Sequence, residues 1–563
     1  MQKVTKKRWV IAKKIPSHVR EELKSYSPFL SQILFNRGII TTVEAENYFK
    51  KIGSISNPFK MKDMDVAVER IITAIKMREK IAVYGDYDVD GVTVTAVLVQ
   101  VIKQLNGDVC EYIPNRFDEG YGLNIEALDL LAESGIDLII TVDCGIRSIK
   151  EIDHALSKGL EMIITDHHEP LSVLPQCQAI ISPKRDGDTY PEKNLAGVGI
   201  AYKLVEALLS KMDNHGLRVE DWLDLVAIGT VADLVPLTGE NRALVKAGLK
   251  EVRFGRRPGV RSLAGVAGRD VQQIKSSDIG FMLGPRLNAA GRLDSALQAY
   301  ELLSTQEMSK SGLLAQKLDD QNRFRQQITT EMMVEAETQI EQCGDDLLLF
   351  AVHKEFNEGV VGLVASRLTE KYYRPSIICH KGEEVSKASC RSIKVFHITH
   401  ALDRVSHLLV RHGGHSMAAG FTVENEHLEE LIENLRQIAE EEIGREDLIP
   451  VINADIEVEL KDLHPNILKE IDLLEPTGIA NPGVLFVSRN LDVKYCKRVG
   501  ADKTHLRLSV SDGTFTFNCI AFRLGDWADH MPEKVDLLFS YERNSFQGNT
   551  TLQLRVVDIQ ASL

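Results

Sequence analysis

The sequence predicts an α/β protein, with two doubly wound α/β domains joined by a long helix and followed by an all-β barrel of the OB type. The first observation behind this prediction is that short apolar runs alternate with helical segments from residue 80 to 212, and again from 346 to 442. The second is that clusters of Asp and His stand where three of the apolar runs end. The third is a change after residue 450 to short alternating strands broken by turn signals such as Asp512-Gly513, which is typical of a barrel.

The first 300 residues divide into a lead-in and a domain. Residues 1–75 are expected to be a helical lead-in, with 43–49 as one amphipathic piece, and residues 76–300 to form the first α/β domain. Asn124 is the expected cap of the helix that follows it. The expected strands lie at 81–84, 109–113, 138–142, 162–165 and 178–182. The expected helices lie at 67–78, 92–105, 125–133, 148–157, 197–212 and 222–234.

The rest of the chain reads as a connecting helix, a second α/β domain and the barrel, with expected boundaries at 301–345, 346–445 and 446–563. The run 304–342 is too polar on all sides for a core, so we expect it to be a spacer between domains. In the second domain, residues 413–420 are rich in Gly and Ala and are expected to form a loop that lets the backbone approach a ligand. The other expected elements there are strands at 347–352 and 376–380 and helices at 360–372 and 397–409.

Composition narrows the class of protein. Apolar residues make up 44% and charged residues 26%, as in ordinary globular proteins. The eight cysteines lie singly, with no Cys-x-x-Cys pair, which predicts reduced thiols and neither a disulfide framework nor a zinc site. The N-terminus lacks the apolar core of a signal peptide, and no uncharged run approaches the roughly 18 residues that a membrane-spanning helix needs. We therefore expect a cytoplasmic protein that makes no membrane contact.

The net charge of −14 is a weak argument against a nucleic-acid partner. A metal-dependent phosphodiesterase concentrates acidic residues at its site, and basic residues can still line a groove. The local distribution of charge therefore counts for more than the total.

Residues 80–93 organise the first domain, because an apolar strand is followed by three aspartates at alternate positions and then by a helix. In an open α/β sheet, ligands bind just beyond the carboxyl ends of the strands. Carboxylates so close together would take up protons unless a cation neutralised them, and one or two divalent metal ions would do so. The alternative is a solvated acidic turn. The acidic and histidine residues that fall at such strand ends are Asp86, Asp88, Asp90, Asp143, Asp166, His167 and His168.

Asp233 lies in an apolar stretch, between Ala232 and Leu234, and needs a partner if it is buried. The alternative is an aspartate at a helix end that faces water. Asp and His together suit Mn²⁺ or Mg²⁺, and two such ions about 3.5–4 Å apart can activate water and stabilise both oxygens at a phosphorus. No Ser-His-Asp order, cysteine nucleophile or phosphate-cradling glycine loop competes with this chemistry.

Several of these stretches resemble the motifs of the DHH phosphoesterase superfamily. Residues 166–168 resemble its signature, 84–91 its first motif, 141–145 its second and 231–233 its fourth. Residues 413–420 resemble the glycine-rich motif of the DHH-associated domain. The run 284–292, the terminal barrel and the total length together resemble the branch of this superfamily that degrades single-stranded DNA from its 5′ end. The resemblance extends from about residue 80 to the C-terminus, and it implies that the two α/β domains are the DHH and DHH-associated domains.

The resemblance implies a site with two Mn²⁺ or Mg²⁺ ions. Its implied ligands are Asp88, Asp90, Asp143, His167 and Asp233. His168 would stand beside the scissile phosphate, and Asp143 and Asp233 would also be catalytic. Many relatives outside the exonuclease branch carry a His at the position of Tyr84, so one ligand is absent here and Asp86 is a candidate to assist.

The resemblance also implies a pocket for the 5′-terminal phosphate, held by Ser389 and Arg391 with Arg116 as a third contact. Ser389 and Arg391 lie two apart in an extended segment, so both side chains can point to the same face. The further substrate-binding candidates are Arg286, Asn288, Gly414 and His415, and the aromatics of the loop 117–122 are candidates for stacking on bases.

Each of these candidates has a structural alternative. Arg391 could instead pair with a carboxylate, Arg286 and Arg292 could form surface salt bridges, and Arg116 could simply be exposed. His415 could be a satisfied loop histidine, and Phe117 could pack in the core.

The function implied by the resemblance is a metal-dependent exonuclease that releases mononucleotides from the 5′ end of single-stranded DNA, in DNA repair and recombination. A monomer is expected, with a single-strand-binding protein and a helicase as candidate partners. One alternative is a phosphodiesterase acting on short oligonucleotides or cyclic dinucleotides, but such substrates need no strand-tracking barrel. Another is a non-catalytic scaffold, which would have lost metal ligands that are intact here except at Tyr84.

Overall fold

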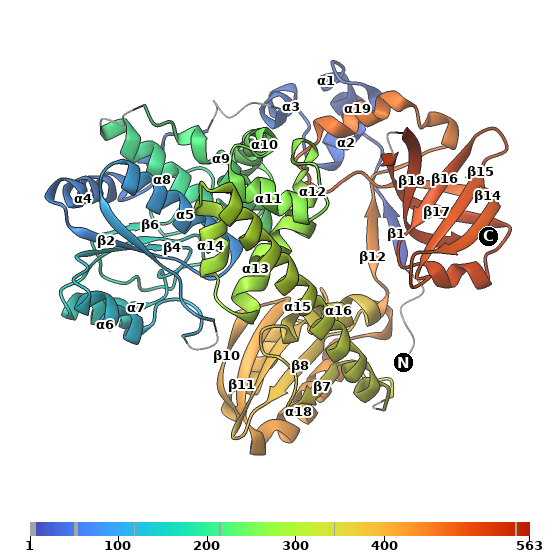
Figure 1. Cartoon of the computed structure of the whole chain (residues 1–563). Helices are drawn as coiled ribbons and strands as arrows, with labels where there is room; N and C mark the ends of the chain where they lie inside the picture. The colour runs from blue at the N-terminus through green and yellow to red at the C-terminus, as the bar shows by residue number, and fades with distance from the viewer. Residues whose placement is uncertain are drawn as a thin grey trace.

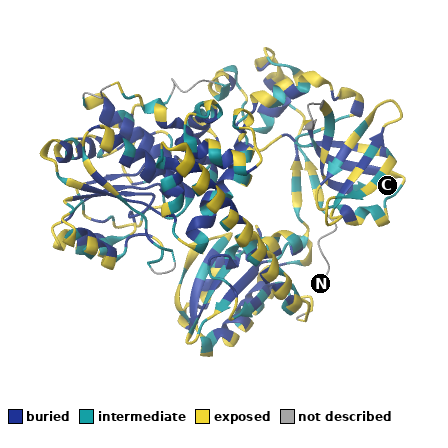
Figure 2. Cartoon of the chain, in the orientation of Figure 1, coloured by how far each residue is buried: buried dark blue, intermediate teal, exposed yellow. Residues whose placement is uncertain are grey.

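The computed structural model describes residues 7–49, 55–116, 119–212, 216–342, 344–546 and 549–562. Figure 1 shows two α/β units bridged by the long helix α15 (Met308–Gln342), with the barrel on the opposite side of the molecule from the first unit. In Figure 2, the buried residues gather in the interior of each of these bodies. The predicted fold class is confirmed.

The first unit is built on a five-stranded sheet in the order β3-β2-β4-β5-β6, in which every neighbouring pair is parallel. Successive strand residues enter two different cores, with Ile140 packed on one side and Ile139 on the other, because helices cover both faces of the sheet. The strands are β2 (Lys80–Tyr84), β3 (Asp108–Tyr112), β4 (Leu138–Val142), β5 (Glu161–Thr165) and β6 (Ala179–Ile181). One face carries α4 (Met64–Met77), α5 (Val89–Gln104) and α8 (Gly197–Lys211), and the other carries α6 (Ile125–Glu133) and α7 (Ile149–Ser157).

The first unit also contains a capped helix at Asn124 and a lobe of helices after α8. The side chain of Asn124 accepts a hydrogen bond from the Ala127 amide (3.1 Å) and caps α6, as predicted. Beyond α8, a helical lobe extends the core on the α5 side of the sheet. Its helices are α9 (Leu223–Ala232), α10 (Gly239–Phe254), α11 (Pro258–Val266), α12 (Ser276–Asp278), α13 (Gly284–Leu293) and α14 (Leu297–Ser304).

The helix α15 is more than the spacer that its polarity predicted. Ala315 and Leu318 lie in the core of the first unit, and Met332, Ala336 and Ile340 lie in a core formed with the second. The buried residues of α15 form a narrow stripe along one side of the helix, and several of them are small. The sequence of the helix is therefore polar overall even though that side is buried. The helix therefore joins the two units through both of their cores.

The second unit contains a mixed five-stranded sheet in the order β10-β11-β9-β8-β7, with only the β7–β8 pair parallel. Its strands are β7 (Leu349–His353), β8 (Ser376–Lys381), β9 (Val385–Arg391), β10 (Leu409–His415) and β11 (Ala418–Glu424). Its helices are α16 (Val361–Tyr372), α17 (Ile398–Arg404) and α18 (Leu428–Glu442).

The stretch 413–420 is a β-hairpin, so the predicted loop is wrong, and the helix predicted for 397–409 ends at Arg404. Gly and Ala are poor strand formers in isolation, but β11 is paired on both edges, by β10 and by β9. A side chain at Gly414 would lie 2.4 Å from the Ala418 carbonyl oxygen, so the small residues allow the close hairpin.

The C-terminal barrel closes because β14 pairs with both β15 and β17. Its strands are longer than the short runs predicted: β14 (Phe486–Val499), β17 (Lys534–Phe546) and β18 (Asn549–Ala561), with β15 (His505–Ser511) and β16 (Thr516–Ala521) between them. Before it come β12 (Val451–Ala454), β13 (Ile456–Glu457) and α19 (Pro465–Leu473).

Residues 7–49 of the predicted lead-in pack with the barrel. Residues 58–75 belong instead to the first unit, whose core contains Met61, Met64 and Ile71, so the boundary expected at residue 75 lies too far along the chain. The strand β1 (Arg8–Ile11) pairs in parallel with β12, so the lead-in is not wholly helical. Leu30, Ile33 and Leu34 share the barrel's core, and the ring of Phe29 stacks on Phe486. The helices of the lead-in are α1 (Ser17–Glu22), α2 (Pro28–Asn36) and α3 (Thr42–Phe49).

Two expectations from composition can be compared with the described residues. Seven cysteines there are free thiols, in agreement with the absence of a disulfide framework. Across the same residues, no helix combines the length and the apolar character needed to span a bilayer.

Candidate metal centre and adjoining cleft

The predicted ligands converge at the carboxyl edge of the first sheet. Asp86 and Asp88 follow β2, Asp143 follows β4, and His167 and His168 follow β5. Asp90 lies in the first turn of α5, and Asp233 ends α9 from the adjoining lobe. Asp143 adopts a left-handed backbone conformation (φ 61°), which is uncommon for a residue other than glycine.

Two of the carboxylates are held by the beginnings of helices. Asp88 caps α5, with its Oδ1 accepting from the amides of Asp90 (2.8 Å) and Gly91 (3.1 Å). Asp90 accepts from the amides of Gly197 (2.6 Å) and Val198 (3.0 Å) at the start of α8. A helix N-terminus favours negative charge, so this arrangement holds two carboxylates side by side.

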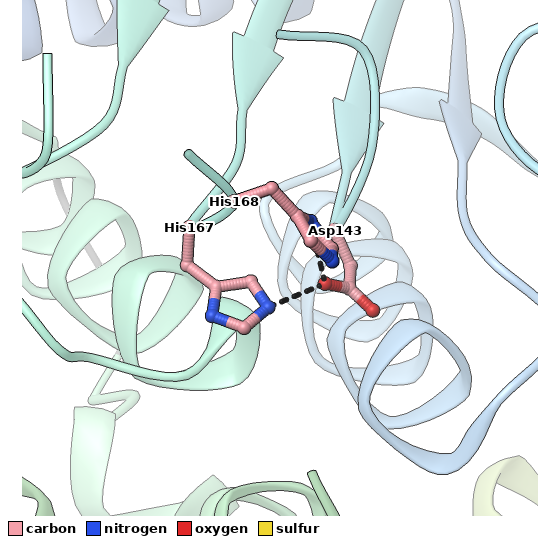
Figure 3. A group of neighbouring side chains, drawn as sticks. All are labelled: Asp143, His167 and His168. Carbon is pink, nitrogen blue, oxygen red and sulfur yellow. Dashed lines mark ion pairs between the residues drawn. The ribbon is translucent and has the colours of Figure 1, made fainter. Parts of the chain in front are cut away.

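Asp143 and the two histidines form the centre of the cluster (Figure 3). The Nε2 atom of His167 lies 3.0 Å from Oδ1 of Asp143 and 3.6 Å from Oδ2 of Asp233. The Nδ1 atom of His168 is 3.9 Å from the same Asp143 oxygen and 2.8 Å from Oδ1 of Asp166.

Within the described part of the chain, four buried atoms of this cluster have no hydrogen-bond partner: Oδ1 of Asp86, Oδ1 of Asp143, Nε2 of His167 and Oδ2 of Asp233. An unsatisfied buried polar atom costs about 1–3 kcal/mol. The ligand atoms also form three overlapping groups, each with all its atoms within 4.8 Å of one another: Asp143, His167 and His168; Asp90, His167 and Asp233; and Asp86, Asp88 and Asp143. Oxygen and imidazole donors that share a space and lack partners fit a divalent cation.

The protonation preferences of the cluster lead to the same conclusion. Burial, followed by repulsion from neighbouring carboxylates, raises the pKa of Asp90 to about 7 and that of Asp233 to about 9. The pKa values of Asp86 and Asp143 are raised well above their usual range for the same reasons. Burial, and then His168, lowers the pKa of His167 to about 3, so this imidazole is neutral and free to act as a ligand.

Tyr84 offers no ligand atom to the cluster. Its hydroxyl donates to the carbonyl oxygen of Gly122 (3.1 Å), and its ring stacks on Tyr112 at 4.9 Å in the core on the other face of the sheet. Asp86, which was the candidate to assist in place of the missing ligand, lies within one of the three groups of ligand atoms, together with Asp88 and Asp143.

A cleft of about 620 Å³ lies between the two α/β units, and Tyr121, which lines it, contacts His168 of the cluster. Arg116, Ser389 and Arg391, which were predicted together, all line it. Nη1 of Arg391 donates to Oγ of Ser389 (3.2 Å) and to the Cys390 carbonyl (2.7 Å). Tyr87 and Tyr121 line the same cleft, and the guanidinium of Arg116 lies 4.9 Å from the ring centre of Tyr87.

Arg292 also lines the cleft and donates to the Gly359 carbonyl (3.1 Å). Burial, and then Arg116, lowers its pKa to about 10. Burial lowers the pKa of Arg391 as well, with Arg116 adding to this effect. Among the ion pairs of the described residues, none involves Arg116, Arg292 or Arg391, so the alternative of carboxylate pairing is not what the structure shows for Arg391. Three arginines without carboxylate partners suit a multiply charged anion.

The remaining substrate-binding candidates are not brought together in the cleft. Arg286 pairs with Asp319 (2.8 Å) and also donates to the Met282 carbonyl, which ties α13 to α15. Asn288 accepts from the Val89 amide (3.2 Å), so it supports the start of α5. Gly414 and His415 are exposed near the turn of the β10–β11 hairpin.

Tyr121 has a contact that sequence reasoning did not foresee, since its loop was considered only for base stacking. Its hydroxyl lies 3.3 Å from the Asp143 carbonyl oxygen and 3.3 and 3.4 Å from the two ring nitrogens of His168. The glycines on either side of Tyr121 were the only signal in the sequence of an aromatic held on a tight loop. Phe117 of the same loop lies outside the described residues.

Known protein families match the two α/β units and the barrel of this chain. The DHH family N-terminal domain matches residues 80–230, the DHHA1 domain 344–443 and the RecJ OB domain 454–558. The single-stranded-DNA-specific exonuclease RecJ of Bacillus subtilis is 37% identical over 99% of this chain and 71% of its own length. RecJ of Haemophilus influenzae is 35% identical over 94% of this chain and 96% of its own.

The crystal structure of RecJ from Thermus thermophilus in complex with Mn²⁺ superposes with a TM-score of 0.85 at 29% identity, and it covers 99% of this chain and 80% of that one. The Mg²⁺ complex of the same protein gives a TM-score of 0.79 at 27% identity, with coverage of 99% and 79%. The fold, the grouped ligands and the sequence identity over nearly the whole length lead to one conclusion: the chain belongs to the RecJ family of single-stranded-DNA-specific exonucleases.

Proposed function

We propose that this chain is a metal-dependent exonuclease that hydrolyses single-stranded DNA from its 5′ end, releases mononucleotides and acts in DNA repair and recombination. The proposal rests on one observation: the candidate metal ligands lie next to the arginines of the cleft, and within the described residues each of the two sets lacks partners of opposite charge. Buried carboxylate and imidazole atoms that have no hydrogen-bond partner among the described residues lie next to a cleft lined by Arg116, Arg292 and Arg391, none of which pairs with a carboxylate in the described part of the chain. Metal ions bound to the scissile phosphodiester would supply partners for the carboxylates and imidazoles. The 5′-terminal phosphate of the same strand would supply the anion for the arginines.

Asp88, Asp90, Asp143, His167 and Asp233, with Asp86, would hold two Mn²⁺ or Mg²⁺ ions. When bound, such ions activate water and stabilise charge on the phosphoryl oxygens. The protein's own contribution is to hold these ligands in place before metal binds. Asp88 and Asp90 are fixed by the amides of two helix N-termini, and Asp143 is fixed at the end of a central strand.

His168 is placed to assist at the scissile phosphate. Asp166 accepts from its Nδ1 (2.8 Å) and from its backbone amide (3.0 Å), while the other Asp166 oxygen accepts from the Ile146 amide. The Asp166 carboxylate raises the pKa of His168, against the effect of burial. With Nδ1 engaged by Asp166, Nε2 of a protonated His168 would donate to a phosphoryl oxygen.

The residues that line the cleft support digestion from the 5′ end. A 5′-phosphate is a compact dianion, and arginine forks with a hydroxyl bind such a group well. Arg391 and Ser389 from β9, with Arg116 and Arg292 from the first unit, provide these donors on both sides of the cleft. Tyr121 touches both the cleft and His168, so a terminal nucleotide seated there would have its phosphodiester beside the metal ligands.

The barrel completes the proposal as the module that holds the strand beyond the site. Phe522 is 48% exposed on its surface, with the Arg555 guanidinium 5.4 Å from the ring centre, a pairing suited to a base and a phosphate. Cytoplasmic action as a monomer, with a single-strand-binding protein and a helicase as partners, belongs to the same proposal.

Digestion of matched 5′- and 3′-labelled single strands with Mn²⁺ or Mg²⁺ tests the proposal. We expect the 5′ label to appear at once as a mononucleotide, while the 3′-labelled strand shortens progressively. The reverse pattern would contradict the direction. Hydrolysis confined to very short oligonucleotides would favour the alternative substrate class, and a chelator should stop all activity.

A further inference from the structure

A buried arginine, Arg242 near the start of α10, joins the catalytic unit to the segment that leads into the barrel. It is 2% exposed, and its guanidinium makes five hydrogen bonds, all to backbone carbonyls. Nη1 donates to Leu474 (2.8 Å) and Pro476 (2.9 Å), and Nη2 to Leu473 (3.2 Å) and Glu475 (3.1 Å). These carbonyls belong to the segment that leaves α19 and leads into the barrel.

The fifth bond reaches the lead-in. Nε of Arg242 donates to the Tyr48 carbonyl (3.2 Å), and the guanidinium lies 3.9 Å from the centre of the Tyr48 ring. A guanidinium has five N–H donors, so every donor is satisfied. Burial lowers the pKa of Arg242. Its partners are neutral carbonyls at a helix C-terminus, where a cation is favoured.

A second buried residue, Asn481, completes the junction from the barrel side. Its Nδ2 donates to the carbonyls of Leu474 (3.1 Å) and Pro476 (2.6 Å), two of the carbonyls that Arg242 binds. Its Oδ1 accepts from the Tyr48 hydroxyl (2.8 Å) and from Nε of Arg37 (2.9 Å). The lead-in, the catalytic unit and the barrel therefore share one network.

The same network is connected to the metal centre by a short piece of chain. Asp233 ends α9, and the Leu237 amide donates to the Ile479 carbonyl (2.8 Å), only four residues later. Buried Asn241, next to Arg242, donates to the Pro236 carbonyl (3.1 Å). Leu234 has a left-handed backbone (φ 63°), so its conformation is imposed by the surrounding structure. A candidate metal ligand and the barrel's attachment thus lie on one ten-residue segment.

Resting on the proposed exonuclease function, we propose that Arg242 is a positioning residue that determines the preference of the enzyme for long strands, because it holds the barrel at a fixed place relative to the metal centre. A strand bound on the barrel is then presented to the site at high effective concentration. If the joint were loose, the two binding surfaces would act independently, and the gain from binding both would fall. Cleavage of a strand too short to reach the barrel would not depend on the joint.

The test compares Arg242→Ala with the unmodified chain on two substrates. One is a strand several times longer than the roughly 4–16 nucleotides that an OB fold covers, and the other is a tetranucleotide, at about the lower limit. We expect KM for the long strand to rise at least about tenfold, with kcat retained and with both parameters for the short one unchanged. Affinity for the long strand, measured by anisotropy in a chelator, should fall by the same factor.

Chemical rescue distinguishes loss of the joint between the barrel and the catalytic unit from misfolding of the Arg242→Ala variant. Removing the side chain leaves room for a guanidinium ion, so low concentrations of guanidinium should restore the long-strand KM of Arg242→Ala, whereas ammonium at equal ionic strength should not. Asn481→Ala, which acts from the barrel side, should raise the same KM to a smaller extent and provides a second variant if Arg242→Ala folds poorly. Arg257→Ala is the matched control, because Arg257 is a buried arginine that pairs with Asp224 inside the catalytic unit.

Two results would overturn the inference: equal losses on long and short strands in both junction variants, or an unchanged long-strand affinity. Because affinity in a chelator does not require hydrolysis, this measurement stands apart from the proposed function, whose failure would appear as an inactive unmodified chain.

Discussion

Two regions of this molecule bury charge, and they do so in opposite ways. At the candidate metal centre, carboxylates lie close together and four buried atoms have no hydrogen-bond partner among the described residues. At the junction with the barrel, Arg242 is equally buried but makes five hydrogen bonds. Burial of an unpaired charge is costly, so the first arrangement persists only if something absent from the polypeptide completes it. The second is complete in itself, and its role is to hold two parts of the molecule together.

The strongest test of this contrast is Asp143→Ala. Asp143 belongs to two of the three groups of ligand atoms, so its loss should disturb metal binding throughout the site. We expect hydrolysis to fall at least about 1,000-fold, because metal ions contribute several kcal/mol to such reactions. Digestion assays in Mn²⁺ measure this, with retained fold and DNA binding as controls. Near-normal turnover would rule out the proposed centre.

Metal affinity should depend on pH with a definite sign. The pKa values of Asp90 (about 7) and Asp233 (about 9) are raised, so these carboxyls hold protons at neutral pH and a metal ion must displace them. Affinity should therefore rise with pH, by about tenfold per unit for each proton displaced. Calorimetric titration with Mn²⁺ between about pH 6 and 9 measures this, and affinity independent of pH would contradict it.

Without metal, a substitution at the junction with the barrel and one at the candidate metal centre should change the free energy of unfolding differently. Arg242→Met removes five hydrogen bonds and leaves the carbonyls of Tyr48, Leu473 and Glu475 without the donor that Arg242 provides, so it should lower the free energy of unfolding by about 3 kcal/mol. Asp233→Asn replaces a buried carboxyl, crowded by other acidic groups, with a neutral amide of the same size and should leave stability unchanged or raise it. Urea unfolding of both variants in a chelator tests the contrast, which fails if both variants are destabilised alike.

Arg391→Ala should weaken recognition of the strand's end. Loss of one charge-assisted contact costs about 1.5–3 kcal/mol, so the variant should lose most of its preference for 5′-phosphorylated over 5′-hydroxyl strands. Competition between the two strands measures this, and Mn²⁺ titration checks that metal binding is intact. An unchanged preference would place the end-binding pocket elsewhere.

The smallest expected effect is on the barrel. Deleting residues 450–563 would also expose the core that the lead-in shares, so Phe522→Ala is the cleaner change. Loss of one stacked base should cost about 1–3 kcal/mol of affinity for long strands and little for short ones. Equal affinity for long strands with and without Phe522 would show that this face does not bind DNA.

Much of the first unit could be predicted from sequence alone, because its signals are local. The strand at 138–142 and the Asn124 cap were both placed correctly, since buried parallel strands are continuous apolar runs and caps depend on the adjacent turn. The grouping of the candidate ligands could be predicted because parallel strands end at one edge of the sheet, so residues far apart in sequence meet there. The resemblance to a known family then predicted that Arg116, Ser389 and Arg391 come together, and all three line one cleft.

Only the tertiary structure decided the rest. The 413–420 stretch became a hairpin because strands on both sides pair with β11, and the polar helix α15 entered two cores through one narrow stripe. Arg286 reads like a substrate contact but pairs with Asp319, whereas Arg292, in the same helix, lines the cleft. Arg242 carries no signal at all in the sequence. The role of a long polar side chain depends on which groups reach it in space, and neither composition nor periodicity contains that information.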